Sequence, residues 1–102
     1  MNVRYNPAAR REVEEAAEWY ESQKGGLGDE FLSEYDVAIQ VLTGAPRVFR
    51  VIPVPGSHRE IRRCLVDRFP YQIIYEIVAE EIVILAVAHI RRKPFYWKGR
   101  TP

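Results

Sequence analysis

The C-terminal part of the sequence gathers side chains that suit contact with a charged partner. Residues 89–100 contain one histidine, five basic residues, three consecutive aromatic residues and no acidic residue. Guanidinium and ammonium groups attract phosphates, and flat aromatic rings stack on nucleobases. The segment therefore predicts a surface for nucleic acid or another anionic partner. A structural alternative stays open, in which Phe95 and Trp97 anchor the chain on the core while the charges face water.

Two further cations, Arg62 and Arg63, lie next to each other in a segment patterned as a strand. Neighbouring strand residues point to opposite faces, so one arginine should be exposed and the other approaches the core. A buried arginine needs a carboxylate, and Glu60, Asp67 and Glu76 are the nearby candidates. The pair is either part of the same basic surface or a set of ion pairs on the sheet.

His89 could act as a general base, because imidazole titrates near neutrality. The alternative is a hydrogen bond to a backbone carbonyl. His58 lies in a Pro/Gly-containing loop and is expected to be solvated, and Cys64 reads as a small strand residue. With two histidines, one cysteine and no ligand spacing, we expect no metal site and no cofactor.

These side chains must be positioned by a small α+β domain that spans residues 1–102. Asn6-Pro7 and Gly28-Asp29 predict the starts of two helices, which end near Gly25-Gly26 and Gly44-Ala45-Pro46. Apolar residues recur at spacings of three and four in both, so the helices form an antiparallel hairpin.

The remaining chain predicts a sheet that packs on this hairpin. Residues 3–5 form a short strand at most, and residues 60–66, 71–78 and 82–88 are strands with short connections. The expected fold is a short N-terminal strand, the helical hairpin and a three-stranded antiparallel meander, in two layers. The expected core between the layers comprises Val13, Ala16, Tyr20, Phe31, Tyr35, Ile39, Leu42, Ile84 and Ala86.

Charge is divided unevenly along the chain. The net charge is +1, but residues 1–45 sum to −5 and residues 46–102 to +6. The division is compatible with a basic face for an anionic partner or with two solvated faces of opposite sign. The longest apolar run, residues 82–88, is too short to span a membrane, and the N-terminus has no secretion signal. We therefore expect a cytoplasmic protein without membrane contact.

Two segments carry a resemblance to a known family: Phe69–Tyr75 (FPYQIIY) and Ile84–Trp97 (ILAVAHIRRKPFYW). They are similar to the strands and basic ending of the RelE/ParE superfamily, the bacterial toxins of type II toxin–antitoxin pairs. The Arg-Arg-x-Pro-x-Tyr-Trp ending resembles the ParE, or plasmid-stabilisation, branch. The resemblance covers essentially the whole chain and implies the same α+β order.

The RelE branch cleaves mRNA on the ribosome with several cations and a tyrosine. By resemblance, Arg63 and Arg92 match cationic positions of that set, whereas Leu65 and Gln72 stand where cations are usual. Tyr96 lies near the late tyrosine position. If the protein were such a ribonuclease, its catalytic residues would be Arg63, Arg92, His89 and Tyr96.

The resemblance therefore favours a ParE-type toxin that inhibits DNA gyrase by binding, without catalysis, and is neutralised by a cognate antitoxin. The residues expected to bind the target or the antitoxin are Arg62, Arg63, Arg91, Arg92, Lys93, Tyr96 and Trp97. Self-association is compatible with this interpretation. The alternatives are the ribosome-dependent mRNA interferase and a toxin-like protein that is inactive and only binds an antitoxin.

Overall fold

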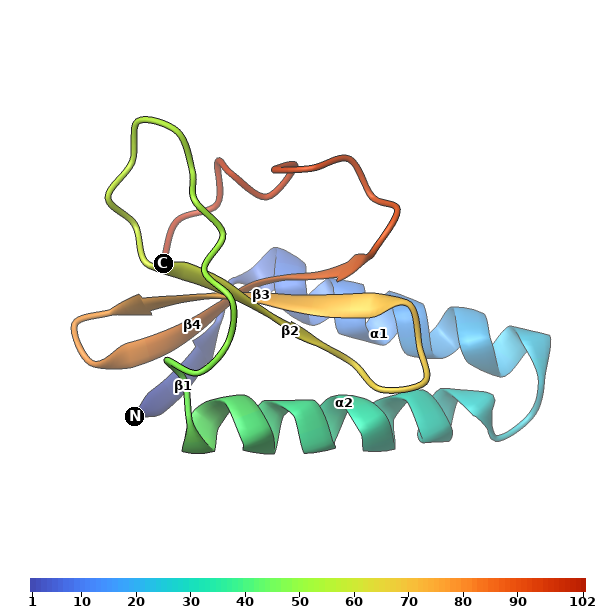
Figure 1. Ribbon diagram of the computed structural model, residues 1–102. Coiled ribbons are helices and arrows are strands. Elements are labelled where there is room, and N and C mark those ends of the chain that lie inside the picture. The colour runs from blue at the N-terminus through green and yellow to red at the C-terminus, as the bar shows by residue number, and fades with distance from the viewer.

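The computed structural model describes all residues from 1 to 102 and confirms the predicted α+β order (Figure 1). The elements are β1 (Asn2–Tyr5), α1 (Pro7–Gln23), α2 (Leu27–Gly44), β2 (Ile61–Leu65), β3 (Tyr71–Val78) and β4 (Glu81–His89). Strands β2 and β4 differ by one residue at each end from their predicted bounds. None of the helices is long and apolar enough to cross a membrane.

The two helices begin and turn where the sequence indicates. The Asn6 side chain accepts a hydrogen bond from the Ala8 amide at 2.9 Å, and Pro7 occupies the first turn of α1. Between the helices, the Glu21 carboxylate accepts hydrogen bonds from the amides of Gly26 and Gly28. A Cβ at Gly28 would lie 2.7 Å from the Ala17 carbonyl oxygen, so this close crossing requires glycine.

The sheet is mixed, with the strand order β1-β4-β3-β2. The predicted meander is present, because β2 pairs with β3 and β3 with β4, both antiparallel. Strand β1 joins the other edge of β4 in parallel, with Asn2 opposite Glu81 and Tyr5 opposite Ile84. The first strand of the chain is therefore held by the last.

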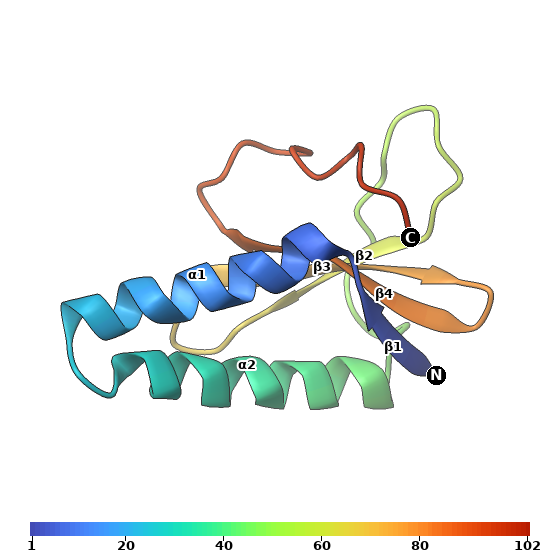
Figure 2. The ribbon, with the colours of Figure 1, turned by 180° about the vertical axis from the view of Figure 1, so that it is seen from behind.

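Both helices cover the same face of the sheet, as the two opposite views show (Figures 1 and 2). Of the predicted core, six members are buried between these layers: Ala16, Tyr20, Phe31, Tyr35, Leu42 and Ile84. Val13 and Ile39 are only half-buried at the margin of this core, so their predicted burial is too strong. They lie on the flanks of the apolar stripes rather than at their centres.

The prediction that Ala86 packs beneath the helices is wrong. The pairing of β3 with β4 shifts between Ile74, which faces Ala86, and Tyr75, which faces Ile84. Leu85 is the extra residue of a bulge, so Leu85 and Ala86 belong together to the apolar cluster on the opposite face. Because strict alternation is interrupted here, the strand pattern alone assigns Ala86 to the wrong side.

The sheet face away from the helices is also covered. The predicted two-layer fold did not include this covering. Residues 45–60, here called the β2 loop, and residues 90–102, here called the C-terminal segment, rise on this side of the sheet (Figure 1). Beneath them lies a second apolar cluster of Val54, Ile61, Ile74, Val83, Leu85, Ala86 and Trp97. Trp97 thus has the anchoring role that the sequence left as an alternative.

Candidate functional site

The β2 loop and the C-terminal segment are fastened to each other by one buried ion pair. Glu76 of β3 is the only charged residue that is almost fully buried, and its two carboxylate oxygens accept hydrogen bonds from the Arg59 guanidinium at 2.7 and 3.1 Å. The same guanidinium donates to the carbonyl oxygens of Lys98 and Arg100. Arg59 therefore joins the β2 loop, the sheet and the C-terminal segment.

A second set of contacts holds the C-terminal segment at the other edge of the sheet, where it meets Glu12 of α1. Its carboxylate accepts hydrogen bonds from the Tyr96 hydroxyl at 2.7 Å, from Arg100 at 2.8 Å and from the Val87 amide at 3.0 Å. Burial and the bond to Glu12 raise the pKa of Tyr96 above its ordinary value. Its hydroxyl is therefore held as a protonated donor inside this contact.

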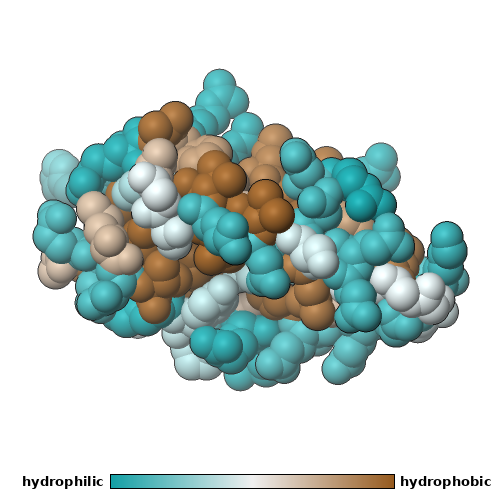
Figure 3. Space-filling view, turned by 90° about the horizontal axis from the view of Figure 1, so that it is seen from below, coloured by the Kyte–Doolittle hydropathy of each residue, from teal (hydrophilic) through white to brown (hydrophobic).

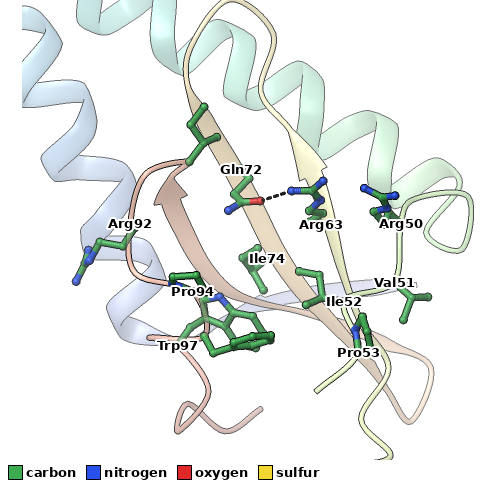
Figure 4. Close-up of a pocket in the computed structure, with 12 residues that line it drawn as sticks. Arg50, Val51, Ile52, Pro53, Arg63, Gln72, Ile74, Arg92, Pro94 and Trp97 are labelled. Carbon is green, nitrogen blue, oxygen red and sulfur yellow. Dashed lines mark hydrogen bonds between the residues drawn. The ribbon is translucent and has the colours of Figure 1, made fainter. Parts of the chain in front are cut away.

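Between the two segments lies an open groove of about 540 Å³ on the outer face of the sheet (Figure 4). Its floor includes Arg63 of β2 with Gln72 and Ile74 of β3. The other lining residues are Arg50, Val51, Ile52 and Pro53 from the β2 loop and Ile90, Arg92, Pro94, Phe95 and Trp97 from the C-terminal segment. No acidic side chain lines the groove, so the only charges on its lining are positive.

The arginines that line the groove differ in how many contacts their guanidinium groups make within the protein. Arg63 makes one long hydrogen bond, 3.4 Å, to the Gln72 side chain, and the Arg50 guanidinium has no partner in the protein. Arg92 lines the groove, but its guanidinium lies 4.0 Å from the centre of the Tyr96 ring and points away from the groove (Figure 4). Two guanidinium groups therefore remain for an anionic partner.

Arg50 was not among the residues selected from the sequence. It lies beside Arg63 because the β2 loop runs back along β2: the Arg63 amide donates to the Arg50 carbonyl at 3.0 Å, and Val51 bridges to Arg62. The extended, proline-containing character of residues 47–55 is the only local signal for this pairing. A contact between loop and strand is not encoded at either residue alone.

The remaining predicted site residues are dispersed. Arg62 points to the helical face, as its alternation with Arg63 requires, and donates to Glu60 and to the carbonyl oxygens of Arg47 and Phe49. Its guanidinium is therefore structural, and Glu60 is one of the carboxylates expected to pair with it. Arg91 and Lys93 are exposed and form no ion pair, but they do not line the groove.

The four residues named for RNA cleavage do not converge either. Arg63 and Arg92 both line the groove, but the Arg92 guanidinium points away from it and Tyr96 is engaged with Glu12. His89 accepts a hydrogen bond from the Arg91 amide on its Nδ1, and its ring packs against Tyr71, with 5.4 Å between ring centres. The groove can therefore bind anions, but no histidine or carboxylate lines it that could accept a proton.

Comparison with known proteins agrees with the resemblance. The profile of the family described as "ParE toxin of type II toxin-antitoxin system, parDE" matches residues 3–94. The chain belongs to the ParE toxin family. A solved chain of the chromosomal ParDE toxin–antitoxin system from P. aeruginosa has the same fold, with a TM-score of 0.65. It is 18% identical and the match covers 87% of this chain and 95% of that one. No curated protein sequence matches.

Membership of the ParE family implies a cognate antitoxin, so a second, apolar surface is also relevant. Val37 and Val41 of α2 are half exposed beside Phe49, and Leu65 of β2 exposes 59% of its surface. These four residues, here called the α2–β2 strip, border a cleft of about 180 Å³. Viewed from the helical side, apolar side chains gather into a patch among polar ones (Figure 3).

The strip continues onto an open strand edge of this ParE-family chain. The Val66 amide donates to Tyr71 in the turn towards β3, whereas the Arg63 amide donates away from β3, to Arg50. By the alternation of an antiparallel ladder, the backbone groups of Leu65 also point away from β3. The Leu65 carbonyl accepts only a weak 3.7 Å contact from the Cys64 thiol. This edge can pair with another extended chain.

Proposed function

We propose that this ParE-family chain acts as a toxin by binding DNA gyrase and blocking its activity, and that its cognate antitoxin neutralises it. The observation that carries the proposal is the family match over residues 3–94. The groove supports action by binding, because it combines available arginines with apolar side chains and offers no proton acceptor.

RNA cleavage requires more than the groove provides. A 2′-hydroxyl must lose a proton while the leaving oxygen gains one, and developing charge on the phosphate needs several cations around it. Here Gln72 is neutral, Leu65 is apolar and the Arg92 guanidinium is directed to Tyr96. These observations favour the gyrase proposal over the mRNA interferase alternative.

For the antitoxin, the α2–β2 strip is the surface with matching chemistry. An extended apolar segment placed there would hydrogen-bond to the backbone of Leu65 and bury Val37 and Val41. From the sequence, Arg62, Arg91 and Arg92 are among the residues expected to bind the target or the antitoxin. The Arg62 guanidinium already donates to three oxygens, on Glu60, Arg47 and Phe49, so it has little capacity for another partner.

Two assays on the purified chain test the target. We expect inhibition of gyrase-driven supercoiling of a relaxed plasmid, and no codon-phased mRNA cuts in a ribosome translation reaction mapped by primer extension. Arg63→Gln should weaken gyrase inhibition, whereas the matched change Arg11→Gln, on exposed α1 surface, should not. Phased cuts with unaffected gyrase would overturn the proposal in favour of the interferase. Inactivity in both assays would favour an inactive, antitoxin-binding protein.

A further inference from the structure

The groove places two guanidinium groups that have few contacts within the protein next to apolar and aromatic surface, and no carboxylate lies among them. Arg50 is exposed and unpaired, and Arg63 holds only the 3.4 Å contact to Gln72. Across the groove, Phe95 is 38% exposed and its ring lies 5.8 Å from that of the buried Trp97, centre to centre. Such a site has one part for an anion and another for a flat apolar group.

We infer that the groove binds single-stranded nucleic acid, with a backbone phosphate on Arg50 and Arg63 and a base against Phe95. This inference names the chemistry of the partner in the groove, and it rests on the proposed function in taking the groove as the surface that faces the target. A volume of about 540 Å³ is in the range of nucleotide-sized ligand sites. Arginine with an aromatic platform binds strands with little sequence preference.

The form of the groove favours a single strand over a duplex. Arg63, Gln72 and Ile74 lie on the sheet, whereas the β2 loop and the C-terminal segment stand above it on both sides (Figures 1 and 4). A duplex is too broad to bring its phosphates to this floor between the walls, and its bases are already stacked. A single strand can enter and present a phosphate and an unstacked base together.

Gln72 adds a polar contact for the base. Its side-chain oxygen accepts the hydrogen bond from Arg63, which leaves its amide nitrogen without a partner in the protein. That nitrogen can donate to a base carbonyl at the floor of the groove. The Arg59–Glu76 pair keeps the two walls joined, so the site exists before the strand enters.

The test uses the complete chain and the anisotropy of fluorescein-labelled dT10 and rU10. Both strands present the phosphates and bases that the site requires, so at least one should bind. With one phosphate held by Arg50 and Arg63, affinity should fall roughly two- to threefold between 50 and 200 mM salt. Preference for dT10 or for rU10 identifies DNA or RNA as the source of the strand.

Variants locate the binding. Arg50→Gln and Arg63→Gln should each weaken binding about three- to tenfold, and Phe95→Ala about fivefold or more. Arg11→Gln, on the exposed surface of α1, is the matched control and should bind as the parent does. Thermal melting of each variant separates loss of binding from loss of folding.

The inference is overturned if neither strand binds, or if the Arg50/Arg63 double variant binds as tightly as the parent. It is also overturned if a labelled duplex binds more tightly than either single strand, or if polyglutamate at equal charge concentration displaces the strand. Gyrase supercoiling measured on the same samples separates the two proposals. Gyrase inhibition without strand binding removes only this inference. Strand binding in the groove without gyrase inhibition removes only the proposed target.

Discussion

Glu76 allows the buried ion pair to be tested at the scale of one residue. Glu76→Gln leaves Arg59 without its carboxylate beneath the β2 loop, and a charge that loses its buried partner is costly. We expect the free energy of unfolding to fall by about 2–4 kcal/mol in a urea titration. The control Glu81→Gln removes a 3.4 Å surface pair with Arg4 and should cost less than about 0.5 kcal/mol. Equal losses would contradict a special role for Glu76.

Cys64 predicts a dependence of stability on alkaline pH. Burial, and to a lesser extent the charge of Asp67, raises the pKa of the thiol from 9.0 to about 11. Below pH 9 the thiol is protonated in both states and its contribution is complete. As the pH rises from 9 to 11 the unfolded chain loses this proton first, so stability falls.

We therefore expect the parent to lose about 2 kcal/mol more than Cys64→Ala between pH 8.5 and pH 11, measured by urea unfolding at each pH. Both proteins contain the tyrosines, and Tyr75, whose pKa is raised to about 12 by burial and then by the charge of Cys64, titrates above this pH range in the folded state. Parallel pH profiles for the two proteins would show that the thiol titrates normally.

For single residues, the sequence predicts the face to which a side chain points better than it predicts the residues that the side chain contacts. The alternation of a strand correctly separates Arg62 from Arg63, and Glu60, which pairs with Arg62, is one of the three carboxylates that the sequence offers as partners. It does not identify Arg50, which meets Arg63 only because the β2 loop returns along the strand. His89 takes a structural hydrogen bond, although from a backbone amide rather than to a carbonyl. Long-range neighbours decide these contacts, and single-residue chemistry does not encode them.

At the scale of elements, two glycines in α2 predict opposite outcomes for the same substitution. Gly28→Ala would place a Cβ 2.7 Å from the Ala17 carbonyl where α2 crosses α1, and should lower the free energy of unfolding by about 1–3 kcal/mol. Gly44→Ala, near the end of the same helix, meets nothing within 4 Å. It should be neutral or stabilise by up to about 1 kcal/mol. Urea titrations of both variants measure these changes. An unchanged free energy of unfolding in Gly28→Ala would show that the two helices can move apart without loss of stability.

The order and type of the elements were predictable because their signals are local. Helical periodicity, the Asn6-Pro7 start and the glycines after α1 lie within one or two turns of the structure that they specify. The parallel partner of β1, the bulge at Leu85 and the covering of the outer face by Trp97 are not local. They depend on segments that meet only in the folded chain, and the misplaced Ala86 follows directly from the bulge.

For the whole molecule, we expect separate surfaces for the antitoxin and for the target. Val41→Arg places a charge in the α2–β2 strip and should weaken a complex with the cognate antitoxin at least tenfold, measured by calorimetry, while gyrase inhibition persists. Ile90→Arg, an equally exposed change beside the groove on the other face, should leave antitoxin affinity unchanged. Loss of antitoxin binding in Ile90→Arg alone would place the antitoxin on the groove face instead.

The pairing of β1 with β4 has a consequence for synthesis on the ribosome. Asn2 leaves the exit tunnel long before Glu81, its partner across the sheet. At about 5–20 residues per second, β1 waits roughly 4–16 s for β4 to be made. The contact of Glu12 with Arg100 forms later still. During that interval the hairpin exposes its apolar face to other nascent chains and chaperones. The native fold, and any toxicity that depends on it, therefore arises only after residues 81–100 have been made.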